Sequence, residues 1–121
     1  MHGMKGERVL MRIHIGERDK YHGKPLYTAI VELLRKKNYA GATVLRAIMG
    51  FGASSHIRTD SIEVLSLDLP IVVECVETAE RIDAILPALD EMIGGGLITL
   101  EKVNVIAYRP GSTGGDEPPK K

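Results

Sequence analysis

The spacing of apolar residues along this chain switches between every second position and every third or fourth, which constrains its fold more than any other feature. Residues 9–15 carry an apolar side chain at each odd position, and this period of two predicts a strand. Residues 26–34 place leucine and isoleucine at i, i+4, i+7 and i+8, which forms one face of a helix. Pro25 suits the first turn of that helix. A strand followed by a helix is therefore the first unit of the fold.

The rest of the chain repeats this alternation with one additional strand. Further strands are predicted at residues 42–49, 71–76 and 97–108, with a loop at 50–61. A short strand at residues 62–67 is interrupted by Asp68-Leu69-Pro70 just before 71–76, so the two stretches count as one strand of the fold. Thr78 is a suitable N-cap for a second helix, whose apolar face includes Ile82, Ile85 and Leu89. Apolar residues change parity within the last strand, and a β-bulge near residues 101–102 would return them to one face.

The resulting order, strand–helix–strand–strand–helix–strand, predicts an α+β fold of the ferredoxin-like βαββαβ kind. Right-handed crossovers place both helices on one face of the sheet. Residues 71–76 are apolar on both sides, so the other face is also partly apolar, and a contiguous exposed apolar face usually marks an interface. We expect one domain over residues 7–110 that associates with itself. Residues 111–121 lack periodicity, and we expect them to form a disordered tail.

Composition excludes several classes of protein. Sixteen basic residues balance sixteen acidic ones, and a nucleic-acid-binding domain would show a basic excess. The sequence contains neither an apolar run of about 20 residues nor an apolar leader, and Cys75 is its only cysteine. These features predict a cytoplasmic protein without a disulfide or a nucleic-acid partner.

Two glycine clusters, residues 50–52 and 94–96, stand at joints between the predicted elements. Glycine permits positive φ and leaves backbone N–H groups open to a ligand. Two such loops in one small domain suggest a ligand cleft. A helix C-cap and a turn would also account for Gly94, Gly95 and Gly96.

Several segments, taken in order, resemble the PII-like nitrogen-regulatory signalling proteins. They are residues 41–44 (Gly-Ala-Thr-Val), 49–52 (Met-Gly-Phe-Gly), 68–74 (Asp-Leu-Pro-Ile-Val-Val-Glu) and 93–96 (Ile-Gly-Gly-Gly). More narrowly, residues 23–27 (Gly-Lys-Pro-Leu-Tyr) and the stretch Gly-Leu-Ile-Thr-x-Glu from Gly96 resemble the uncharacterised prokaryotic family called domain of unknown function 190. The resemblance extends over about residues 8–110.

The resemblance implies a homotrimer with ligand clefts between neighbouring subunits. It assigns ligand contacts to Gly50, Phe51 and Gly52, to Gly94, Gly95 and Gly96, and to Arg109, and the charged loop before the first helix adds Lys24. The implied effector is a small anion, with an adenine nucleotide as the leading candidate. The loop after the second strand, with Ser54, Ser55, His56 and Arg58, would contact a partner protein such as a membrane transporter or an enzyme.

Two departures from the family pattern affect these expectations. Leu97 stands where a basic residue normally follows the glycine loop, so a charge-assisted phosphate contact is missing. No tyrosine lies between Gly50 and Cys75, so the tyrosine modified in nitrogen-regulatory members has no equivalent. Weak to moderate nucleotide binding without that modification is therefore expected.

Other functions are consistent with the same fold. A small trimeric ferredoxin-like enzyme, or a metal-binding trimer similar to the divalent-ion tolerance proteins, remains an alternative. However, no catalytic residue is assigned, because Ser54, Ser55 and His56 are adjacent and no acid orients the histidine. No metal ligand is assigned either, since the interior histidines lack zinc-type spacing with a partner.

Overall fold

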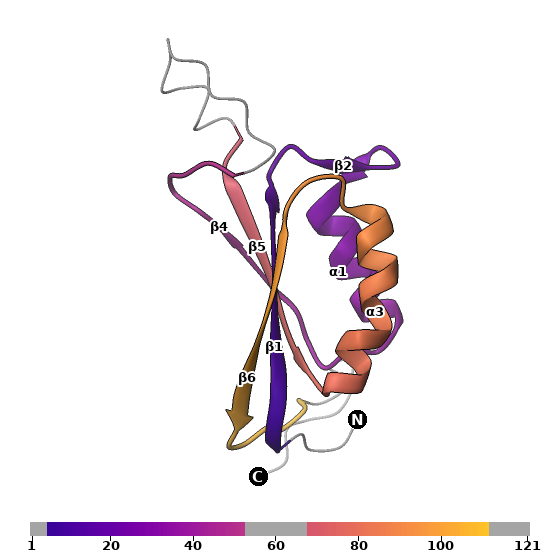
Figure 1. Cartoon of the computed structure of the whole chain (residues 1–121), viewed down its shortest axis with the longest axis vertical. Helices are drawn as coiled ribbons and strands as arrows, with labels where there is room; N and C mark the ends of the chain where they lie inside the picture. The colour runs from indigo at the N-terminus through magenta and orange to yellow at the C-terminus, as the bar shows by residue number, and fades with distance from the viewer. Residues whose placement is uncertain (1–4, 53–67, 112–121) are drawn as a thin grey trace.

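The computed structural model describes residues 5–52 and 68–111, which form a four-stranded antiparallel sheet with two helices against one face (Figure 1). The elements are β1 (Gly6–Gly16), β2 (Lys20–Tyr21), β3 (Lys24–Pro25), α1 (Leu26–Lys36), β4 (Thr43–Arg46), β5 (Pro70–Glu77), α3 (Ala79–Met92) and β6 (Leu97–Val105). The main sheet has the order β4-β5-β1-β6, and β2 and β3 form a separate hairpin. This arrangement is compatible with a small ferredoxin-like fold. The strand predicted at 62–67 and the tail predicted at 111–121 lie outside the described residues, apart from Gly111.

The alternation along β1 determines which side chains enter the core. Met11, Ile13 and Ile15 are buried on the side of the helices. The paired positions of β5 add Cys75, Val73 and Ile71 to the same layer. From the helices the core receives Leu26, Ile30, Leu34, Ile82, Ile85 and Leu89. The predicted helical faces are thus confirmed, and the burial of apolar side chains between one sheet face and two helices drives this fold.

The two edge strands differ from the sequence-based expectation. β4 is shorter than the predicted strand at 42–49, because its pairing with β5 ends at Arg46. The bulge expected near residues 101–102 is absent, and β6 pairs with β1 residue by residue without interruption. Directly opposed residues share a face, so Leu100 lies on the same face as Met11, whereas Val103 lies on the open face. The change of parity along this strand is therefore real, since β6 places apolar side chains on both faces of the sheet.

A buried carboxylate joins the end of β5 to the segment that follows α1. The side chain of Glu77 is 2% exposed and accepts hydrogen bonds at 2.9 Å from the backbone N–H of Ala40 and at 3.1 Å from that of Thr78. Its third partner is Arg81, whose guanidinium lies 3.0 Å from the carboxylate. Three donors satisfy a charge that would otherwise be costly to bury.

Arg81 extends this network to the C-terminal end of α1. Its guanidinium donates to the carbonyl oxygens of Lys37 at 2.6 Å and of Asn38 at 3.0 Å, and it lies 4.1 Å from the centre of the Tyr39 ring. Asn38 has a φ of 62°, the left-handed conformation that commonly ends a helix. A cation at this position also interacts favourably with the negative end of the helix. Glu77 and Arg81 together therefore bind α1 to α3.

We predict that Glu77→Ala destabilises the fold by about 3–5 kcal/mol, because it removes one member of a buried ion pair and leaves two N–H groups without their acceptor. Chemical denaturation followed by circular dichroism measures this loss. Glu80→Ala is the matched control, since Glu80 is exposed in the first turn of α3. Equal stability of the two variants would contradict the role assigned to Glu77.

Candidate functional site

The two glycine clusters lie at the same end of the sheet but at opposite edges. A Cβ atom built on Gly50 would lie 3.2 Å from Cγ of Pro70, and one on Gly96 would lie 2.5 Å from the carbonyl oxygen of His14. Both contacts are at the end where β1 finishes and β5 begins. However, β4 and β6 are separated by β5 and β1, which corresponds to roughly 14 Å at ordinary strand spacing. One copy of the chain therefore does not bring the two clusters into one cleft.

The first glycine cluster follows an apolar segment that faces outward. Ile48 is 97% exposed, Met49 is 78% exposed and Phe51 is 62% exposed. Three large apolar side chains within four residues are unusual on a solvated surface. This segment is therefore a candidate contact surface, and Phe51 does not pack in the core of its own chain.

The two predicted cationic contacts lie at different ends of the sheet. Arg109 follows Tyr108, whose hydroxyl lies 3.5 Å from the carbonyl oxygen of Ala40, near the opposite end of the sheet. Lys24 belongs to the β2–β3 hairpin and forms an ion pair with Glu32 of α1 at 2.7 Å. The predicted partner-loop residues Ser54, Ser55, His56 and Arg58 lie outside the described residues.

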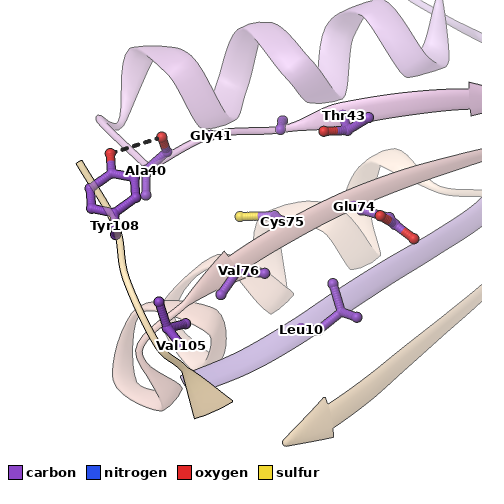
Figure 2. A pocket seen from close by; sticks show the side chains of 10 residues that line it. Leu10, Ala40, Gly41, Thr43, Glu74, Cys75, Val76, Val105 and Tyr108 are labelled. Carbon is purple, nitrogen blue, oxygen red and sulfur yellow. Dashed lines mark hydrogen bonds between the residues drawn. The ribbon is translucent and has the colours of Figure 1, made fainter. Parts of the chain in front are cut away.

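A cavity of about 310 Å³ opens beside the last part of β5, on the sheet face that the helices leave uncovered (Figure 2). Its walls come from β1, β5, the segment between α1 and β4, the start of β4, the end of β6 and the residues after it. Apolar side chains form most of the lining, and Figure 2 shows Tyr108 at one end of the cavity and Glu74 at the other. The lining residues are Leu10, Ala40, Gly41, Ala42, Thr43, Glu74, Cys75, Val76, Val105 and Tyr108. A cavity of this kind suits a small, flat and largely apolar group.

The polar groups of this cavity have defined states. Glu74 accepts a hydrogen bond from Nε of Arg12 at 3.0 Å, and another arm of the same guanidinium reaches Glu101 at 3.0 Å. These two hydrogen bonds raise the pKa of Arg12, so the guanidinium stays charged. Cys75 also lines the cavity, but its side chain belongs to the core on the helix side, and burial there raises the pKa of the thiol from 9.0 to about 12. The thiol is therefore protonated at neutral pH and is not an activated nucleophile.

Sequence reasoning did not find this cavity, because its lining residues are scattered. Leu10 and Tyr108 are nearly a whole chain apart, and only the folded sheet brings β1 and the segment after β6 to the same cavity. The motif Gly-Ala-Thr-Val at residues 41–44 was the available signal, since its first three residues line the cavity.

Among residues 5–52 and 68–111, no three His, Cys, Asp or Glu side chains come close enough together to hold a metal ion. In the same ranges, no helix has the length and apolar character needed to cross a bilayer.

Comparison with known proteins finds one family and several relatives. The profile of the DUF190 family, described as "Uncharacterized ACR", matches residues 8–105. A UPF0166 protein of Aquifex aeolicus is 39% identical over 102 residues, which cover 83% of this chain and 94% of the relative. A UPF0166 protein of Methanocaldococcus jannaschii is 35% identical over 97 residues, which cover 79% of this chain and 89% of the relative. A second UPF0166 protein of Aquifex aeolicus is 33% identical over 99 residues, which cover 82% of this chain and 97% of the relative.

We predict that Gly96→Ala lowers the free energy of unfolding by about 1–3 kcal/mol, because the new methyl group would meet the backbone of His14. Gly94→Ala is the control within the same loop. A Cβ atom there meets nothing within 4 Å, so its effect should stay within about 0.5 kcal/mol. Thermal unfolding of both variants measures the difference. If Gly96→Ala were as stable as Gly94→Ala, the loop would have moved to accommodate the methyl group, and the prediction would be wrong.

Proposed function

This chain belongs to the DUF190 family, and we propose that it is a PII-like regulatory protein: a homotrimer that binds an adenine nucleotide in clefts between its subunits. The observation that carries this proposal is the cavity on the uncovered sheet face, beside a surface suited to another copy of the chain. The partner protein, in this proposal, contacts the exposed segment that follows β4.

The uncovered face of the sheet supports self-association. Leu45 is 49% exposed and Leu97 is 57% exposed, at opposite edges of this face. Half-buried valines surround an ion-paired centre formed by Arg12, Glu74 and Glu101. An apolar surface with paired charges in its middle resembles an interface core with fixed polar contacts. A second and third copy would remove this surface from water.

The cavity supports a nucleobase as the bound group. Its volume of about 310 Å³ is at the lower end of the range for small-molecule sites, so it would hold the base rather than a whole nucleotide. Leu10 and Val76 offer apolar contact to the ring faces. The Thr43 hydroxyl can donate or accept, and the Glu74 carboxylate accepts hydrogen bonds. The exocyclic amine of adenine is a donor that matches this carboxylate.

The glycine loops would contact the phosphates in the assembled protein. Thr43 lies at the start of β4, and the strand leads from the cavity towards Gly50 and Gly52. The loop at residues 94–96 lies at the far edge of the same copy, so a neighbouring subunit would supply it. Its backbone N–H groups can bind an anion, and Leu97 adds no charge to them. We therefore expect modest affinity.

The exposed segment after β4 supports the proposed contact with a partner protein. Ile48, Met49 and Phe51 form an apolar surface beside the proposed nucleotide cleft. A nucleotide that contacts Gly50 or Gly52 would therefore act directly on the conformation of this segment. Such a link between cleft and surface is what a regulatory protein requires.

We predict that light scattering at micromolar concentration gives a mass of about three times 13.2 kDa. Leu45→Asp should yield monomers, because it places an unpaired charge in the proposed interface. Ala84→Asp, at an exposed position of α3, is the control and should remain trimeric. A monomeric unmodified protein would exclude the cleft between subunits.

We also predict that calorimetry detects ATP or ADP binding with a Kd near the micromolar range or weaker. Val76→Trp should fill the cavity and Gly95→Val should obstruct the phosphate loop, each weakening binding at least tenfold, a loss of about 1.4 kcal/mol. Gly94→Ala is the control for the loop, and light scattering verifies the assembly of each variant. Unchanged binding in both variants would show that the nucleotide site lies elsewhere.

A further inference from the structure

A second cavity, of about 480 Å³, lies on the helix side of the sheet, opposite the face used by the proposed nucleotide site. It is lined by α1, α3 and the β2–β3 hairpin, which lies across the upper end of α1 in Figure 1. Its volume is within the range of small-molecule sites. None of the residues that line it takes part in the cavity beside β5.

Two short apolar side chains, one from each helix, line this second cavity. Ala29 of α1 and Ala88 of α3 leave space that a larger residue would fill. Leu33 and Met92 flank them and pack partly against the core. Ala29 and Ala88 therefore create a hollow suited to an apolar group of a few carbon atoms.

The hairpin supplies a flat wall. Tyr21 and His22 stack with their ring centres 4.0 Å apart and their planes 13° from parallel. His22 has a φ of 50° and Gly23 a φ of 85°, so both central residues of this two-residue hairpin loop are left-handed. Asparagine or aspartate is the usual first residue of such a loop. A histidine in this position adds an aromatic surface at the rim of the cavity.

The charged side chains at the rim are balanced. Lys24 and Glu32 neutralise each other through their ion pair at 2.7 Å. Lys36 and Glu91 also line the cavity, and neither forms an ion pair with another residue in the described part of the chain. One cation and one anion are therefore available to a ligand that carries both opposite charges.

We propose that this cavity binds a small zwitterion with an apolar or aromatic side chain, as in a free hydrophobic amino acid. The ligand carboxylate pairs with Lys36 and its ammonium group with Glu91. The ligand side chain lies on the floor formed by Ala29 and Ala88, beside the stacked rings of Tyr21 and His22. This site is separate from the proposed nucleotide site and gives the protein a second effector.

The test is titration of the full chain with L-phenylalanine and L-leucine, followed by calorimetry and by NMR shifts. Saturable binding is expected for both. 3-Phenylpropionate lacks the ammonium group and phenethylamine lacks the carboxylate, so each should bind at least tenfold more weakly than L-phenylalanine. Absence of saturable amino-acid binding, or equal affinity for all three aromatic compounds, would overturn the proposal.

Matched variants locate the site. Ala88→Leu should fill the floor and weaken binding at least tenfold, whereas Ala84→Leu, one turn earlier on an exposed position of α3, should not. Lys36→Ala and Glu91→Gln should each weaken binding, and their neighbours Lys37→Ala and Asp90→Asn should leave it unchanged. Equal binding across each matched pair would overturn the proposed site.

Nucleotide titration of the same variants separates this site from the proposed function. The Ala88→Leu protein should retain the nucleotide affinity of the unmodified chain. If Ala88→Leu weakened nucleotide binding and left amino-acid binding intact, the assignment of the second cavity would be wrong. A protein that bound amino acids and no nucleotide would support this inference and contradict the proposed function.

Discussion

The pairing of β1 with both of its neighbours is the constraint on which the rest of the structure depends. β1 lies at the centre of the sheet, with β5 on one side and β6 on the other, and pairs with both in continuous antiparallel register. Its odd residues from Val9 to Ile15 pack in or against the core, and its even residues from Arg8 to His14 face the opposite side. A shift of one residue would exchange these two sets, so the hydrophobic pattern selects a single register.

The even residues of β1 give the uncovered face its mixed character. Leu10 is apolar and lines the cavity, whereas Arg12 joins β5 to β6 through Glu74 and Glu101. An exposed ion pair of this kind contributes little to the stability of one chain. When water is excluded, breaking such a pair becomes strongly unfavourable. In the trimer that we propose, this network would therefore favour one alignment of the subunits.

The segment that connects α1 to β4 links fold stability to the cavity. The backbone N–H of Ala40 donates to the buried Glu77, and its carbonyl oxygen lies 3.5 Å from the Tyr108 hydroxyl. Ala40 is also a wall of the cavity. One buried carboxylate thus holds the helix layer together and positions a cavity wall. The second cavity has a different origin, since small side chains on the two helices leave it unfilled.

Several features of this fold follow from residues that are close together in the sequence. The apolar residues repeat at every second position in residues 9–15 and at every third or fourth position in residues 26–34. The first spacing buries one side of a strand and the second one side of a helix, so both elements and their buried faces follow from the pattern. The helix ends at Thr78 and Asn38 were also predictable, because capping depends on residues close in the sequence. Element order then limited the topology to a few choices.

Tertiary structure alone decided the features that depend on residues far apart. The parity change in β6 suggested a bulge, yet regular pairing holds because the open face also accepts apolar residues such as Val103. The two glycine clusters are separated by strand order, which local sequence does not encode. The cavity between Leu10 and Tyr108 exists only after the sheet has formed. The sequence by itself determined the elements and their buried faces, since these follow from neighbouring residues. Only the folded chain decided which distant residues share a cavity, because strand pairing sets those distances.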